Sequence, residues 1–105
     1  MEFLVRFEIK VPPELDGEKY EELMAEEKRR GDLLWSSGRL LRIWRVPGRR
    51  ASIGLYDFPD ATELHAEIST LPLFPYMTVS SVEALAVHPA DIKNPTNNGA
   101  STVPS

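Results

Sequence analysis

Residues 2–11 alternate between apolar and polar side chains along the chain. The apolar positions are Phe3, Val5, Phe7 and Ile9. Because successive side chains of a strand point to opposite faces of a sheet, a period of two predicts a half-buried strand. Pro12-Pro13 follows, and these residues end the strand because proline has no N–H to donate to a sheet.

A long helix is predicted between Asp16 and about Ser37. Asp16 is a suitable N-cap, and the glutamates that follow it favour the positive end of the helix dipole. Most of the segment consists of Glu, Leu, Met, Ala, Lys and Arg, which are good helix formers. Ser36-Ser37-Gly38 is typical of a helix end.

The middle of the chain predicts a hairpin and a second, shorter helix. Strands are expected over residues 39–46 and 50–58, and Pro47-Gly48 between them is typical of a turn. The sequence Asp60-Ala61-Thr62-Glu63 resembles a capping box with Asp in the capping position. A short helix is therefore expected to run from there to about Thr70.

An unusual apolar segment, Leu71-Pro72-Leu73-Phe74-Pro75-Tyr76-Met77, separates this helix from a fourth strand expected over residues 77–88. Its two prolines oppose a regular helix. Loops are normally polar because they lie on the surface. We therefore expect this segment to be buried in the wall of a pocket or against a partner chain.

The order strand–helix–strand–strand–helix–strand predicts an α+β fold of the ferredoxin-like type. In this arrangement two helices cover one face of a four-stranded antiparallel sheet. We assign the domain to residues 1–92. The remaining residues, 93–105, are mostly Pro, Thr, Asn, Gly, Ala and Ser, and a segment with so little to bury is expected to be a disordered C-terminal tail.

The composition is that of a single globular domain. The chain has 105 residues and a net charge of −4, with 42% apolar and 27% charged residues. The acidic balance argues against a nucleic-acid-binding protein, and no apolar run approaches the roughly 18 residues of a membrane helix. The N-terminus lacks a signal-peptide pattern, so we expect a cytoplasmic protein. So small a domain is also expected to associate with copies of itself.

Several kinds of chemistry are excluded or disfavoured by the residues. The chain has no cysteine, which excludes disulfides, thiolate catalysis and Cys-ligated zinc. His65 and His88 lack the spacing of metal ligands, so no metal is expected. The sequence has no glycine-rich phosphate loop, and Ser80-Ser81 lacks the context of a serine nucleophile.

One carboxylate of the long helix occupies a position where an apolar side chain is expected. The stripe predicted to face the sheet consists of Tyr20, Leu23, Met24, Glu27, Gly31 and Leu34. Burial raises the pKa of a carboxyl group, which suits Glu27 to act as a general base near neutral pH. Gly31 leaves room for a small ligand. Alternatively, Glu27 lies at the edge of the stripe and reaches water or pairs with Lys28 or Arg30.

Five arginines surround the predicted hairpin and form a local positive patch in an acidic protein. They are Arg39, Arg42, Arg45, Arg49 and Arg50. Guanidinium groups bind carboxylates through paired hydrogen bonds, so the patch is suited to a small acidic substrate. The alternative is a solvated hairpin whose charges discourage edge-to-edge pairing. Trp44, Phe74 and Tyr76 are candidates to line an apolar pocket, although such residues also serve as core or interface.

The chain resembles the muconolactone delta-isomerase family over residues 1–92. The most specific match is the segment 71–77, Leu-Pro-Leu-Phe-Pro-Tyr-Met. Weaker matches follow in the family's order: Phe3-x-Val5-Arg6, Glu27-Lys28, Ile43-Trp44-Arg45, Gly48-Arg49, Glu63-Leu64-His65 and His88-Pro89.

This resemblance implies a ferredoxin-like α+β barrel that needs no cofactor and forms a homo-oligomer, typically a decamer. It implies an isomerase of aromatic (catechol) degradation that moves a proton within an unsaturated lactone, from muconolactone to 3-oxoadipate enol-lactone. The family's catalytic glutamate matches Glu27. We expect this residue to take a proton from the γ carbon of the lactone and return it to the α carbon.

The remaining expected site residues bind the lactone carboxylate substrate. Arg45 and Lys28 are candidates to stabilise negative charge on the carbonyl oxygen, and Arg49 or Arg50 to hold the carboxylate. The aromatic candidates, Trp44, Phe74 and Tyr76, would exclude water and keep the pKa of the glutamate high.

The chain departs from the family pattern at two positions. Leu4 stands where His is often found, and Arg50 stands where Tyr is often found. A chloromuconolactone dehalogenase, or an isomerase of a related butenolide, is therefore an alternative. A non-catalytic binding or assembly module is another alternative, because a fold does not fix a function. The latter predicts a Glu27 that is solvent-exposed or ion-paired, with no adjoining cavity.

Overall fold

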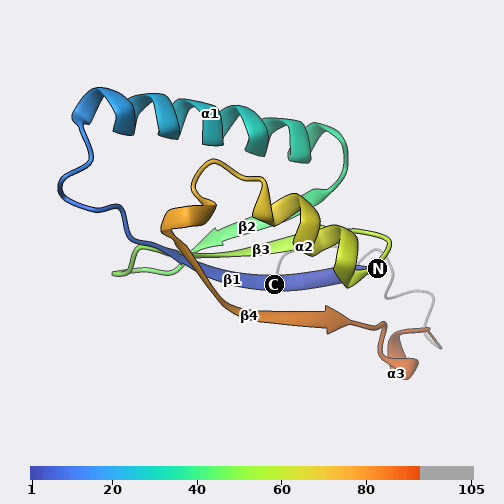
Figure 1. The fold of residues 1–105 in the computed structure, drawn as a ribbon. Coiled ribbons are helices and arrows are strands. Elements are labelled where there is room, and N and C mark those ends of the chain that lie inside the picture. Colours follow the sequence, from blue (N-terminus) through green and yellow to red (C-terminus); the bar gives the residue numbers. More distant parts are fainter. Residues whose placement is uncertain (93–105) are drawn as a thin grey trace.

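The described part of the chain, residues 1–92 of a computed structural model, forms one sheet with two main helices on the same side (Figure 1). Residues 93–105, where a tail was expected, lie outside this part. The elements in chain order are β1 (Glu2–Ile9), α1 (Gly17–Ser36), β2 (Leu40–Arg45), β3 (Ala51–Asp57), α2 (Ala61–Ser69), the 3₁₀ turn η1 (Phe74–Tyr76), β4 (Met77–Leu85) and α3 (Pro89–Ile92).

The four strands are ordered β2-β3-β1-β4, and every neighbouring pair is antiparallel. This order confirms the predicted ferredoxin-like α+β fold. The central strands are β1 and β3, so β2 and β4 form the edges of the sheet. Among the described helices, none is both long and apolar enough to cross a membrane.

The helix boundaries follow from the capping residues. The side chain of Asp16 accepts a hydrogen bond from the Glu18 N–H at 3.0 Å, and that of Asp60 accepts one from the Glu63 N–H at 2.9 Å. Such bonds satisfy N–H groups that have no partner inside the helix. After α1, Gly38 adopts a positive φ of 77°, which glycine tolerates and which turns the chain into β2.

The segment between α2 and β4 is partly buried, as predicted. Leu71 and Leu73 are buried in the described chain, whereas Pro75 is exposed at the tip of η1. The last strand is shorter than predicted, because β4 ends at Leu85 instead of continuing to residue 88. His88 does not join the sheet; its Nδ1 accepts a hydrogen bond from the Ala90 N–H at 3.0 Å at the start of α3.

A β-bulge in β2 decides which of its side chains face the helices. Leu40 lies opposite Tyr56, but the next pair along the strand is Arg42 with Leu55. One extra residue, Leu41, has been inserted, and an insertion of one residue moves all later side chains to the other face. Arg45 therefore lies on the helix side of the sheet, opposite Ser52.

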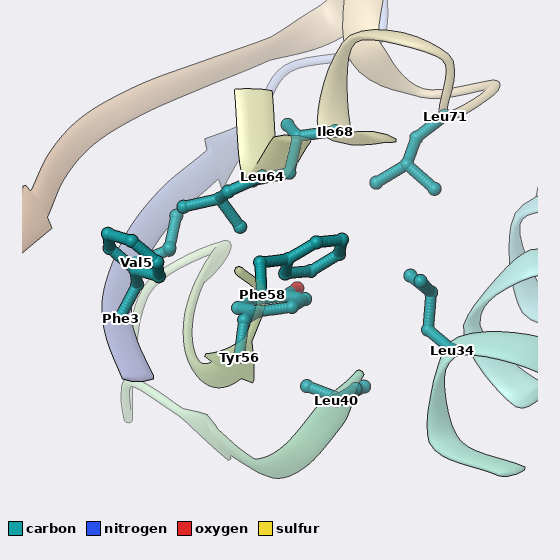
Figure 2. Close-up of a cluster of buried hydrophobic side chains, with 9 residues drawn as sticks. All are labelled: Phe3, Val5, Leu34, Leu40, Tyr56, Phe58, Leu64, Ile68 and Leu71. Atoms are coloured by element: carbon teal, nitrogen blue, oxygen red, sulfur yellow. The ribbon is translucent and has the colours of Figure 1, made fainter. Parts of the chain in front are cut away.

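The core lies between the helix side of the sheet and the C-terminal halves of the helices. Its buried members, shown in Figure 2, are Phe3, Val5, Leu34, Leu40, Tyr56, Phe58, Leu64, Ile68 and Leu71. Leu34 is the one buried residue of α1. The N-terminal half of this helix is therefore only lightly packed, and Tyr20 and Met24 remain 37% exposed.

Candidate active site

Glu27 lies half-buried in the middle of α1, on the side of the helix that faces the rest of the domain. Its Oε1 accepts a hydrogen bond from the backbone N–H of Leu73 at 3.0 Å. Burial raises the pKa of this carboxyl group, while the Leu73 hydrogen bond and the charge of Arg30 act in the opposite direction. Loss of hydration is the largest of these effects, so the net direction is upward.

The bases next to Glu27 in sequence are engaged elsewhere. Arg30 pairs with Glu67 at 2.7 Å and also donates to the Oγ1 and carbonyl oxygen of Thr70. Lys28 is exposed and pairs with Asp32 at 3.0 Å. Within residues 1–92, Glu27 forms no ion pair. The described chain therefore shows neither of the ion pairs considered for Glu27 from the sequence, with Lys28 or with Arg30.

A groove opens between the N-terminal half of α1 and the helix side of the sheet. We call it the arginine groove. It has a volume of about 370 Å³ and is lined by Ile9, Val11, Tyr20, Met24, Arg45, Arg50 and Ser52. Two guanidinium groups thus meet an otherwise largely apolar hollow, which is a suitable environment for a small organic anion.

Glu27 does not itself line the arginine groove; it lies one turn of α1 beyond Met24, which does. It shares the helical stripe of Tyr20 and Met24, which line the groove, and of Leu34, which belongs to the core. Along this stripe the carboxylate therefore marks the boundary between the open groove and the packed interior. A Cβ built on Gly31, one turn further, would meet no atom within 4 Å, so the helix leaves space on this stretch.

The structure brings some of the predicted site residues together and separates others. Arg45 and Arg50 line the arginine groove. Arg49 instead forms a 3.5 Å ion pair with Glu8. Phe74 lines an apolar hollow between α2 and β4, and Tyr76 lines a separate hollow together with charged residues of α1. Neither aromatic residue lines the arginine groove.

Trp44 does not line the apolar pocket for which the sequence made it a candidate. The bulge at Leu41 pairs Trp44 with Ile53, and Ile53 pairs with Arg6 on the side of the sheet away from the helices. Trp44 is 43% exposed there, beneath the guanidinium of Arg42 at 5.7 Å from its ring centroid. Within one chain it does not shield Glu27 from water.

The sequence prediction missed Tyr56 and Ser52, which accompany Glu27 and the arginines. Tyr56 is buried, and burial together with the charge of Glu27 raises the pKa of its phenol to about 12. From the sequence alone, an aromatic residue at this strand position indicates only a core residue. Among the described residues, no group of three or more acidic or histidine side chains is arranged to hold a metal ion.

These features define a class: a small α+β protein with a half-buried carboxylate on the helix that also lines a groove with two guanidinium groups. They are suited to acid–base chemistry on an anionic molecule. The model of the family described as muconolactone delta-isomerase matches residues 1–91. The chain belongs to this family.

Individual relatives agree with the family match. The chain is 37% identical over 92 residues to a muconolactone delta-isomerase of Pseudomonas aeruginosa, covering 88% of this chain and 95% of that protein. It is 37% identical over 91 residues to one of Rhodococcus opacus, covering 87% and 97%. A crystal structure of muconolactone isomerase superposes with a TM-score of 0.79 at 36% identity, covering 88% of this chain and 95% of that one.

The raised pKa of Glu27 predicts a pH-dependent stability. The folded protein holds the Glu27 proton more tightly than the unfolded chain does. The stabilisation that the protonated Glu27 gives the folded protein is therefore fully present below the unfolded pKa. It is lost as the pH rises through the higher folded pKa. The free energy of unfolding of Glu27→Gln should therefore increase relative to that of wild type as the pH rises from about 4 to about 7. Urea denaturation at several pH values measures this difference.

The neighbouring glutamate provides a control of opposite sign. The hydrogen bond from Arg29 lowers the pKa of the exposed Glu26 carboxyl group. Glu26→Gln should therefore lose stability relative to wild type as the pH rises through the lowered folded pKa of Glu26 towards its ordinary value of 4.5. A Glu27→Gln difference that stays constant, or that follows the Glu26→Gln trend, would contradict a raised pKa at Glu27.

Proposed function

We propose that this protein is a muconolactone delta-isomerase in which Glu27 is the general acid–base group. The observation that carries this proposal is the half-buried Glu27 carboxylate one helical turn from a groove with two arginines. The family match and the relatives of the same name support the substrate. The reaction moves a proton within an unsaturated lactone and so shifts its C=C bond.

The Glu27 carboxylate has the features needed to accept a proton from carbon. One oxygen is held by the Leu73 N–H, which orients the carboxylate, and no cation of the described chain neutralises it through an ion pair. Its raised pKa brings the conjugate acid closer to neutral pH, where a group is most effective in both accepting and returning a proton.

The reaction then follows in two proton transfers. Glu27 takes the proton from the γ carbon of the lactone, and the electron pair of that C–H bond moves through the C=C bond onto the carbonyl oxygen. The dienolate takes the same proton back at the α carbon, which leaves the double bond between the β and γ carbons. One carboxylate serves both steps when the two carbons present the same face of the ring to it.

Arg45 and Arg50 are suited to hold the carboxylate on the side chain of the lactone. Both line the arginine groove, whereas Arg42 lies on the other face of the sheet. A carboxylate bound near the open end of this groove directs the lactone ring towards Glu27. Arg50 is one of the two residues at which the chain departs from the family pattern, and it adds a second positive charge at this place.

We further propose that the protein is a homo-oligomer, and the family resemblance favours a decamer. Both main helices cover the same face of the sheet (Figure 1). The strand register places Leu4, Trp44, Ile53 and Leu55 on the other face, on three neighbouring strands. Val82 and Leu85 of the edge strand β4 are 47% and 41% exposed. Monomeric proteins rarely leave so much apolar surface in water.

Replacing Glu27 tests the assignment of the base. Glu27→Gln keeps an oxygen that accepts the Leu73 hydrogen bond but removes the proton acceptor, so kcat for muconolactone should fall by about 10²–10⁴-fold. The loss of substrate is followed by ultraviolet absorbance. Glu26→Gln, on the exposed side of the same helix, should turn over like wild type. Turnover of Glu27→Gln at the wild-type rate would refute the mechanism.

Arginine substitutions test how the substrate is recognised. Arg45→Gln and Arg50→Gln should each raise KM by about 10–100-fold, the equivalent of one lost charge-assisted hydrogen bond. This loss should largely disappear with the methyl ester of the substrate, which lacks the negative charge. Arg42→Gln provides the matched control on the opposite sheet face. Equal effects on acid and ester would contradict carboxylate binding.

Light scattering coupled to gel filtration tests self-association. The molar mass of the wild type should be a multiple of the chain mass, ten-fold for a decamer. Trp44→Asp puts a charge on the apolar sheet face and should lower the measured mass while circular dichroism shows a folded protein. A wild type that elutes with the mass of one chain at micromolar concentration would disprove the oligomer.

A further inference from the structure

The side chain of Tyr56 lies folded back along its own strand. A Cβ built on Gly54 would lie 2.5 Å from Cε2 and 3.1 Å from the hydroxyl oxygen of Tyr56. The far end of the ring therefore rests directly on Gly54, on the helix side of β3. This direction leads towards Ser52, which lines the arginine groove. The hydroxyl group thus points from the core towards the groove.

The Tyr56 hydroxyl has no hydrogen-bond partner among the described residues, although the residue is only 5% exposed. No polar side-chain atom of the described chain is completely enclosed without a partner. It follows that the hydroxyl oxygen still borders accessible space. An unpartnered hydroxyl in this position is available to a bound molecule.

Packing alone explains the ring of Tyr56 but not its hydroxyl. The ring lies 6.5 Å from that of Phe58, centroid to centroid, within the apolar core. Phenylalanine would make the same contacts without bringing a polar atom into this region. The phenol also stays protonated at neutral pH, because burial and the nearby charge of Glu27 raise its pKa to about 12. It is therefore a donor throughout the physiological range.

We propose that the Tyr56 hydroxyl, supported by Gly54, donates a hydrogen bond to the carbonyl oxygen of a lactone bound between Glu27 and the arginine groove. This inference rests on the proposed isomerase function and adds to it a second catalytic residue. Lys28, a sequence candidate for this task, is paired with Asp32 in solvent.

The role of this donor follows from where charge develops. When Glu27 takes the γ proton, the electron pair ends on the carbonyl oxygen, which becomes negative. A donor already aimed at this oxygen stabilises the dienolate more than the neutral lactone, and only such a difference accelerates the reaction. Tyr56 keeps its own proton, and the proton that Glu27 took returns to the α carbon.

The variant Tyr56→Phe removes the hydroxyl and retains the ring. We expect kcat for muconolactone to fall by about 100-fold, KM to change little, and the melting temperature to remain close to that of wild type. Ser80→Ala, which removes a hydroxyl from the edge strand β4, should leave both kinetic constants unchanged.

A second variant tests whether Gly54 acts through the Tyr56 hydroxyl. Gly54→Ala places a methyl group against the ring, which must displace the hydroxyl. It should lower kcat in the wild-type background and add little in the Tyr56→Phe background. Such non-additivity is expected of residues that act as one unit, whereas independent losses in stability would add.

The outcomes separate this inference from the proposed function. If the wild type isomerises muconolactone and Tyr56→Phe retains kcat, the donor role is wrong and the isomerase function stands. A kcat loss that occurs only together with a lowered melting temperature also overturns the donor role. If the wild type turns over no lactone, both proposals fail.

Discussion

The hydrogen bond from the Leu73 N–H to Glu27 connects the two parts of the chain on which the candidate site depends. Leu71 and Leu73 are buried, so the segment after α2 is held firmly enough to present a backbone donor to α1. This donor favours the charged carboxylate, while loss of hydration disfavours it more strongly. The Leu73 N–H thus fixes the direction of the carboxylate, whereas its burial raises its pKa.

The way α1 is attached explains why a groove opens one helical turn from this carboxylate. Its C-terminal half is held by Leu34 in the core and by the ion pair of Arg30 with Glu67 of α2. Its N-terminal half buries no side chain in the described chain, and the arginine groove opens beneath it. Glu27 lies where the packed half of the helix meets the open half. The site is therefore a consequence of incomplete packing along one helix.

The sheet contributes through the bulge in β2 and the glycine in β3. The bulge turns Arg45 towards the helices and Trp44 away from them. Gly54 leaves the space into which the ring of Tyr56 folds. Arg45 and Tyr56 thereby lie on the helix side of the sheet, whereas Trp44 lies on the outer face, where further chains are proposed to pack.

The sequence by itself determined the element order, the helix caps and the position of Glu27 on the inner stripe of α1, because periodicity and capping are local properties. It also predicted burial of the segment 71–77, since apolar residues in a loop need other apolar side chains to pack against. Only the tertiary structure decided that Trp44 faces away, that Arg45 and Arg50 share a groove and that the ring of Tyr56 folds onto Gly54. A single inserted residue in a strand reverses its faces, and contacts between distant strands and helices depend on packing that no local pattern records.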